Sequence, residues 1–298
     1  MYQARAGGTT NDAITAPMIA PANAKINIVF TIEVDRSYLT GAKISSQLLK
    51  MAEHEPDNSR RANETNTISL DGRRLSEADL YAVAARPDVT RVRIFALKQN
   101  LGPLATLTSL RHLELTDPYL LDGLERLQQI ESLMLYAFPR ISSLNVVGAL
   151  TNLKKLMLST PPGYDASRKC YEVESFEPLG QLANLEALTM RGIVPRTGGL
   201  EPIRRLTGLR RVDITHVYVF GVEDYARLAA ALPLAEGHSL QPVFEAAWAG
   251  TCPRCGSAKI ALTAPPPHTP KTACPICDRE RIERHLTAWN RVLSQATP

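Results

Sequence analysis

The chain has 298 residues, of which 44% are hydrophobic and 21% charged, the composition of an ordinary globular protein with one or two domains. Its net charge of +4 comes from 34 basic and 30 acidic residues, which does not favour nucleic acid or an anionic membrane as partner. The sequence has no apolar run of about 18 residues to span a bilayer, and residues 1–24 lack the apolar core of a signal peptide. We therefore expect a cytoplasmic protein with a disordered tail at residues 1–24. Export by another route stays open.

Two elements precede the central part of the chain. Apolar alternation in residues 25–34 predicts a strand, and SYLTGAKISSQLLKMA after it predicts a helix. We expect residues 25–65 to cap the repeats that follow, because the first apolar side chains of a stack would otherwise face water. The stretch GRRLSEADLYAVAA then predicts a helix with Ser76 at its N-cap. Its apolar positions, expected in the core, are Leu75, Leu80 and Val83.

The middle of the chain repeats one apolar pattern. In LATLTSLRHLEL, leucines recur at intervals of three, three, three and two residues, and four further copies follow. Two looser copies precede them. Each copy ends in two apolar residues separated by one position, such as Leu113 and Leu115. The first residue of this pair is, in successive copies, Ile68, Val92, Leu113, Leu133, Leu156, Leu188 and Val212. They are separated by 24, 21, 20, 23, 32 and 24 residues, mostly within the range of about 20 to 29 expected for one repeat family.

This pattern resembles the L-x-x-L-x-L core of the leucine-rich repeat over roughly residues 66–232. The final L-x-L has the period of a strand, and the preceding L-x-x-L-x-x-L suits a short helix or 3-10 segment. The resemblance implies an α/β leucine-rich-repeat solenoid, with a curved parallel sheet on its concave face. Amphipathic helices alone would not explain the change of interval from three to two.

Two features depart from that family. The Asn usually found three residues after the second strand leucine is replaced here, and we expect apolar side chains to fill the corner. The replacing residues are Leu97, Pro118, Phe138, Pro161, Ile193 and Val217. The longest interval contains residues 159–175, which are rich in Pro, Gly and Ser and carry Cys170, and so predict a protruding loop that contributes to partner binding.

The side chains that alternate with the strand leucines are the candidate interface. Four of them, Phe95, Met134, Tyr136 and Met157, predict an apolar centre. Its expected basic border consists of Arg91, Arg93, Lys155, Arg191 and Arg211. An apolar centre with a charged border is typical of a protein-binding surface. Glu114 and Asp213 interrupt the basic residues, which disfavours direct DNA reading. The alternative is a set of solvated side chains without a partner.

The C-terminal part contains a cysteine pattern. Residues 233–250 are expected to form a linker or cap in which Phe244 and Trp248 pack. Cys252, Cys255, Cys274 and Cys277 then follow with the spacing C-x2-C-x18-C-x2-C, close to that of structural zinc sites. The surrounding residues, about 250–279, resemble a zinc ribbon.

Four thiolates fill a tetrahedral Zn²⁺ site and leave no open position for water, so the metal is expected to be structural. Disulfides or redox chemistry are the alternatives. His268 and His285 lie nearby but are not needed as ligands.

Residues 251–298 are thus assigned to a zinc ribbon and a final helix. In DRERIERHLTAWNRVLSQ, one apolar stripe is expected to pack on the ribbon or on the last repeat, with partner docking as the alternative. That stripe comprises Ile282, Leu286, Trp289 and Leu293. A second stripe comprises Arg281, Arg284 and Arg291.

No phosphate-binding loop, nucleophile elbow or H-E-x-x-H motif is present, so catalysis is not expected. We expect a monomeric, non-enzymatic module that binds a protein partner. The alternative is a nucleic-acid-associated regulator that uses the ribbon and the arginine stripe.

Overall fold

The computed structural model describes residues 66–161, 170–215, 217, 219–265 and 269–296. The expected tail and N-terminal cap lie outside these residues, as do His268 and positions 162–169 of the insert.

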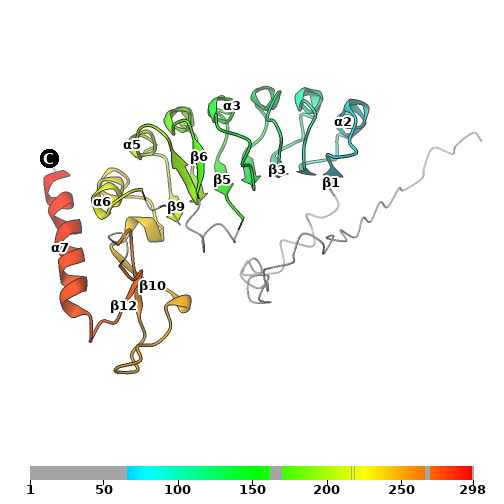
Figure 1. Ribbon diagram of the computed structural model, residues 1–298. Helices are drawn as coiled ribbons and strands as arrows, with labels where there is room; N and C mark the ends of the chain where they lie inside the picture. Colours follow the sequence, from blue (N-terminus) through cyan, green and yellow to red (C-terminus); the bar gives the residue numbers. More distant parts are fainter. Residues whose placement is uncertain (1–65, 162–169, 216, 218, 266–268, 297–298) are drawn as a thin grey trace, which may run out of the picture. The chain divides into compact units, whose positions relative to one another are not determined.

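Seven strands form one parallel sheet in the order β1-β2-β3-β4-β5-β7-β9 (Figure 1). They are β1 (Thr67–Asp71), β2 (Arg91–Phe95), β3 (His112–Thr116), β4 (Ser132–Tyr136), β5 (Lys155–Ser159), β7 (Ala187–Arg191) and β9 (Arg211–Thr215). All neighbours pair in one register, so Val92, Leu113 and Leu133 are partners in a continuing row. This confirms the predicted solenoid and shows that the two looser copies, Ile68 in β1 and Val92 in β2, are true repeats.

Short helical segments connect successive strands, or in the case of α6 follow the last one, and lie along one side of the row of strands (Figure 1). They are α2 (Glu77–Ala84), η2 (Gly102–Thr106), η3 (Leu124–Arg126), α3 (Asn145–Gly148), η4 (Glu177–Gln181), α5 (Glu201–Arg204) and α6 (Val222–Ala231). The predicted N-cap is confirmed: Ser76 and Asp79 form a reciprocal capping box at the start of α2.

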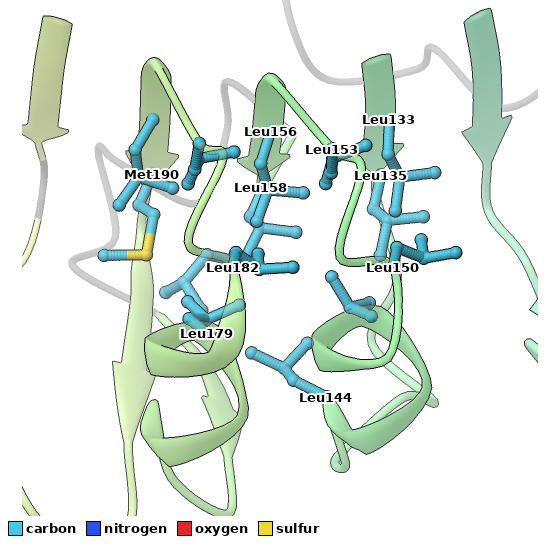
Figure 2. Packing of buried hydrophobic residues seen from close by; sticks show 14 of the residues in the cluster. Leu133, Leu135, Leu144, Leu150, Leu153, Leu156, Leu158, Leu179, Leu182 and Met190 are labelled. Atoms are coloured by element: carbon cyan, nitrogen blue, oxygen red, sulfur yellow. The ribbon is translucent and has the colours of Figure 1, made fainter. Parts of the chain in front are cut away.

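The core is a single layer of leucines between the strands and the helical segments. Leu156 and Leu158 point inward from β5, and Leu150 and Leu153 meet them from the preceding turn (Figure 2). Each copy adds the same set, and full burial of one leucine contributes about 1.5–3 kcal/mol. Because a single copy cannot enclose its leucines, stability depends on the stacking of neighbours.

Apolar side chains fill the corner after most strands from β2 onward, as expected from the missing Asn. Leu97, Phe138 and Ile193 are fully buried there. The residue before this position is left-handed in several copies, with φ of 52° at Ala96 and 53° at Ala137. Its N–H donates to the next strand, as from Ala137 to Ser159 O at 2.9 Å. The backbone ladder therefore continues one residue beyond the strands and makes the Asn side chain unnecessary.

Polar side chains tie neighbouring copies together at the opposite end of the strands. Asn152 Nδ2 donates to Gln128 O at 2.9 Å, and Asn184 Nδ2 donates to Thr151 O at 2.8 Å. Gln129 occupies the same position one copy earlier and donates to two carbonyls of the preceding turn. Sequence reasoning missed this ladder. Its signal is the polar residue directly before the leucine or isoleucine that precedes β3, β4, β5 and β7.

The insert is only partly the protruding loop that was expected. Its C-terminal end forms β6 (Tyr171–Val173), which pairs in parallel with β8 (Ile193–Pro195). Tyr171 and Val173 are buried, and the Tyr171 ring packs edge-on against Phe138 at 5.7 Å between centroids. These apolar residues extend the core, so this end of the insert is not available to a partner through their side chains.

A polar cap covers the last strand. Glu236 donates its N–H to Arg210 O and accepts from Val212 N, both at 2.8 Å. Beyond it, Ser239 in η5 (His238–Leu240) accepts from Ile214 N at 2.6 Å and donates to Ile214 O at 3.1 Å. The Ser239 hydroxyl thus replaces the backbone partner that an eighth strand would have supplied. It satisfies the free edge of β9, which could otherwise pair with a strand of another chain.

Replacing Ser239 by alanine should destabilise the protein by about 1–3 kcal/mol, because it leaves the Ile214 N–H buried without an acceptor. A urea titration followed by circular dichroism measures this change. Ser69→Ala, at an exposed position of β1, is the matched control and should stay near the wild-type midpoint. Equal midpoints for the two variants would show that the cap does not protect the edge.

Candidate metal centre and concave interface

An antiparallel sheet, β10-β11-β12, brings the two cysteine pairs together. It consists of β10 (Val243–Glu245), β11 (Ile260–Leu262) and β12 (Thr272–Ala273). The first pair precedes β11 and the second follows β12, so antiparallel pairing of these strands places both turns at the same end. Strand β10 comes from residues assigned to the linker and pairs antiparallel with β11.

Tight backbone turns aim the sulfurs at one point. In the first turn, Cys252 N–H donates to Ser257 O and Gly256 N–H donates to Cys252 O, both at 2.8 Å. Gly256 has a left-handed φ of 76°, which glycine adopts without a Cβ penalty. In the second turn, the N–H of Cys277 points at the sulfur of Cys274 at 3.4 Å. Such an N–H stabilises a thiolate at the sulfur it faces.

The four sulfurs lie within 4.8 Å of one another. A tetrahedral zinc site with Zn–S bonds of about 2.3 Å requires S···S distances of about 3.8 Å, so this set can hold such an ion with small adjustments. The 3.4 Å between the sulfurs of Cys255 and Cys274 is far longer than the roughly 2.05 Å of a disulfide. None of these four cysteines forms a disulfide, so the disulfide alternative is not supported.

Hydrogen bonds lower the pKa of two of the thiols, Cys252 and Cys255, which favours the thiolate form that binds a cation. Those from Ser257 lower the pKa of Cys255 to about 6, and those from the N–H groups of Arg254 and Cys255 lower the pKa of Cys252. The pKa of Cys277 is raised to about 12, first by its hydrogen bond with Cys255. The thiols therefore share protons across the cluster, and a bound cation would take the place of those protons.

An ion pair latches the two turns to each other. Arg254, from the first turn, donates to the carboxylate of Asp278 at 2.8 Å and to Cys277 O at 3.3 Å. The same carboxylate accepts from Cys274 N at 2.8 Å. The Cys274 N–H, together with the charges of Arg254 and Arg281, lowers the pKa of Asp278. Sequence reasoning assigned neither Arg254 nor Asp278 to the site.

The nearby histidine serves a different purpose. His285 is buried and its Nε2 lies 2.9 Å from Pro242 O, to which it donates. Burial, as the largest cause, lowers the pKa of His285, so the ring is neutral near pH 7. Among the described residues, the candidate metal cluster consists of the four cysteines alone.

The final helix, α7 (Arg279–Ala296), joins the four-cysteine module, which contains β10 to β12, to the solenoid. Ile282 and Leu286 pack with the small apolar core of that module. One turn further on, Trp289 and Val292 are buried in the solenoid core, and Leu293 packs against it. The expected apolar stripe thus contacts both bodies. Trp248 corrects an expectation: its side chain is 60% exposed and does not pack as a hinge or cap.

Strand register arranges the outward side chains in three rows across the sheet face opposite the helical segments, here called the concave face. The first row runs Thr67, Arg91, His112, Ser132, Lys155, Ala187 and Arg211. The second runs Ser69, Arg93, Glu114, Met134, Met157, Thr189 and Asp213. The third runs Asp71, Phe95, Thr116, Tyr136, Ser159, Arg191 and Thr215.

The expected apolar centre is smaller than the sequence suggested. Met134 and Met157 are direct partners on β4 and β5, and Tyr136 shares strand β4 with Met134. Phe95 lies two strands from Tyr136, with Thr116 between them. The guanidinium of Arg73 lies 5.2 Å from the centre of the Phe95 ring. We call Met134, Met157 and Tyr136 the methionine patch.

The basic border is also uneven. Arg91 and Arg93 both pair with Glu114, at 3.4 and 2.7 Å, so a carboxylate of the protein compensates much of their charge. Lys155 and Arg211 are exposed at the start of β5 and β9. Arg191 is half-buried at the far end of β7. The nine candidate residues therefore share one face of the sheet without forming one continuous patch.

The repeated L-x-L strands, their common register and the single leucine layer define a leucine-rich-repeat solenoid, followed by a small four-cysteine module that could bind a metal. No helix in the described part of the chain combines the length and apolarity that a membrane crossing requires.

Among the solved structures similar to this chain are two that each share 14% sequence identity with it. An internalin from Listeria monocytogenes aligns with a TM-score of 0.33 over 53% of this chain and 55% of its own. A leucine-rich-repeat protein of Leptospira interrogans aligns with a TM-score of 0.28 over 60% of this chain and 56% of its own. This chain thus spans little more than half the length of either structure. No protein-family model matches the sequence, and no curated protein matches it significantly.

Proposed function

We propose that this protein is a non-enzymatic interaction module that binds a protein partner on its concave face. The observation that carries the proposal is the methionine patch, in which Met134 and Met157 stand side by side among polar neighbours. Methionine and aromatic side chains are enriched in protein interfaces, and flexible thioethers adapt to a partner's shape. The core leucines are already buried in the solenoid, so this patch has no role in enclosing them.

We further propose that Zn²⁺, held by Cys252, Cys255, Cys274 and Cys277, is structural. The sulfur spacing, the lowered pKa of Cys255 and the latch between Arg254 and Asp278 support this assignment. When bound, the ion supplies a rigid link between the two turns and no reactive water position. The protein's residues orient the sulfurs, donate hydrogen bonds to them and keep the turns together. Cysteines that form no disulfide are typical of a reducing compartment, so we propose that the protein is cytoplasmic. We also propose that it is a monomer.

The nucleic-acid alternative is weaker because internal contacts occupy the arginine stripe of α7. Arg281 donates to Pro270 O at 2.7 Å and to Thr272 O at 2.8 Å. Arg291 pairs with Glu223 of α6 at 3.6 Å. Two of the three guanidinium groups thus hold the helix in place, which reduces their availability for phosphates.

The double variant Met157→Ala, Tyr136→Ala should weaken capture of a protein partner from nuclease-treated native extract by about tenfold or more, since interface anchors contribute 1 kcal/mol or more each. Its melting temperature should stay near that of wild type, because Met157 is exposed and Tyr136 half-buried. Tyr81→Ala, on the exposed side of α2, is the control and should capture normally. Equal capture by all three proteins would exclude the concave face as the site, and recovery of nucleic acid alone before nuclease treatment would favour the alternative.

A further inference from the structure

The first row of the concave face carries three cations, Arg91, Lys155 and Arg211, at positions about 4.8 Å apart from strand to strand. None of its seven positions is a carboxylate, and the nearest one in line is Glu236, the bridge partner of Arg211 beyond β9. Across the three rows, five cations face three carboxylates. The cations are Arg91, Arg93, Lys155, Arg191 and Arg211, and the carboxylates are Asp71, Glu114 and Asp213. The face is therefore more basic than acidic, and the excess lies in the first row.

Two cations of this row have no ion-pair partner among the residues that the structure describes. Within the described part of the chain, neither Lys155 nor Arg211 takes part in an ion pair, in contrast to Arg91 and Arg93. Asp213, the nearest acidic position to Arg211 on its own strand, instead accepts a hydrogen bond from His238 N at 3.1 Å. Both cations are exposed, and a partner can reach them without first breaking an internal contact.

The titration of His112 reports the same positive environment. Burial is the main cause that lowers the pKa of His112, and the charges of Arg91 and Lys155 lower it further. Glu131 and Glu114 raise it but do not reverse the shift. The ring is therefore neutral near pH 7, and the row keeps its charge from the arginines and the lysine.

The spacing of the two cations sets the length of ligand they fit. Lys155 and Arg211 lie on β5 and β9, with Ala187 of β7 between them. Two strand spacings amount to about 9.6 Å. One three-residue turn of a polyproline II peptide advances by roughly 9.3 Å and places side chains i and i+3 on the same face. Ala187 contributes only a methyl group, so the peptide backbone can approach the sheet between the two charges.

The apolar contact lies directly beside this pair of charges. Met157 is two residues after Lys155 on the same face of β5, and Met134 is its partner on β4. A side chain next to the first carboxylate of such a peptide therefore reaches the methionine patch. Charge in the first row and thioethers in the second together select an acidic segment with one apolar anchor over a purely acidic or purely apolar one.

We infer that the partner presents an acidic peptide segment in the polyproline II conformation, with two carboxylates three residues apart on Lys155 and Arg211 and an apolar side chain on Met134 and Met157. The inference rests on the proposed function and adds the chemical class of the partner. Its electrostatic part steers association, so binding weakens as ionic strength rises.

A random peptide library displayed on phage, selected on the full-length protein, tests this inference. The enriched peptides should carry Asp or Glu at positions i and i+3 with an apolar neighbour. Synthetic copies should bind at least about tenfold more weakly to the double variant Lys155→Glu, Arg211→Glu, because two attractions become repulsions. Arg126→Glu reverses one charge at an exposed arginine of η3 outside the concave face; it is the control for charge reversal away from the site and should bind as wild type.

The other outcomes separate this inference from the proposed function. Non-acidic peptides that lose affinity on Met134→Ala, Met157→Ala but not on charge reversal would leave the concave site standing and overturn the acidic class. Acidic peptides that bind the charge-reversed protein normally would also overturn it. A selection in which no peptide depends on either pair of residues would contradict both the proposed function and the inference.

Discussion

Cys274→Ser is expected to abolish stable metal binding and to expose the C-terminal module to protease. Cys274 is fully buried, its sulfur accepts from Cys277 N, and its backbone N–H is held by Asp278. Structural zinc in small domains contributes on the order of 10 kcal/mol of binding free energy, and a serine hydroxyl does not replace a thiolate ligand. Metal content by mass spectrometry should fall from one zinc per chain to near zero, and cleavage should begin after about residue 250.

The effect should extend into the repeats. Helix α7 packs on both the four-cysteine module and the last repeat. Loss of order in the module therefore releases Trp289 and Val292 from the solenoid core. We therefore expect a lower urea midpoint for the repeats as well as a protease-sensitive C-terminus. Cys170→Ser, at a half-buried position far from the cluster in sequence, is the control and should keep its zinc. Normal zinc content in Cys274→Ser would contradict the metal site, and an unchanged midpoint would contradict the coupling.

Trp289→Ala should destabilise the protein by about 3–5 kcal/mol, the usual cost of removing a large buried aromatic side chain. Only 2% of Trp289 is exposed, at the point where α7 packs on α6. The substitution leaves a cavity there and loosens the contact between α7 and the solenoid. A urea titration monitored by circular dichroism measures the loss.

The chain offers a matched control for this prediction. Trp248→Ala makes the same substitution at a side chain that is 60% exposed, and should change stability by no more than about 0.5 kcal/mol. A chelator should lower the midpoint of wild type more than that of Trp289→Ala, because the variant has already lost the link that transmits metal binding. Equal effects of the two tryptophan substitutions would contradict the bridging role of α7.

The repeats were predictable because their signal is local and recurs. The change of interval from three to two residues marks each strand, and burial of Leu113, Leu133 and Leu156 in one register follows from that period. Likewise, the C-x2-C spacing lets a tight turn direct two sulfurs to one point, whatever surrounds it.

The sequence predicted which side chains lie on the concave face, but not which of them are neighbours there. Alternation identifies which side chains point outward, yet the separation of Phe95 from the methionine patch depends on which strands are neighbours and in what register. Whether a charge is neutralised also depends on a neighbour in another copy, as with Arg93 and Glu114, which are 21 residues apart in sequence.

By itself, then, the sequence determined the solenoid, the apolar corners and the set of four cysteines, because periodicity and short spacings specify them within one or two turns of chain. The tertiary structure alone decided that Ser239 closes the last strand, that Arg254 reaches Asp278, and that α7 packs on two cores. These contacts join residues more than 20 positions apart, or elements from different modules, and depend on where each element comes to lie once the others have packed.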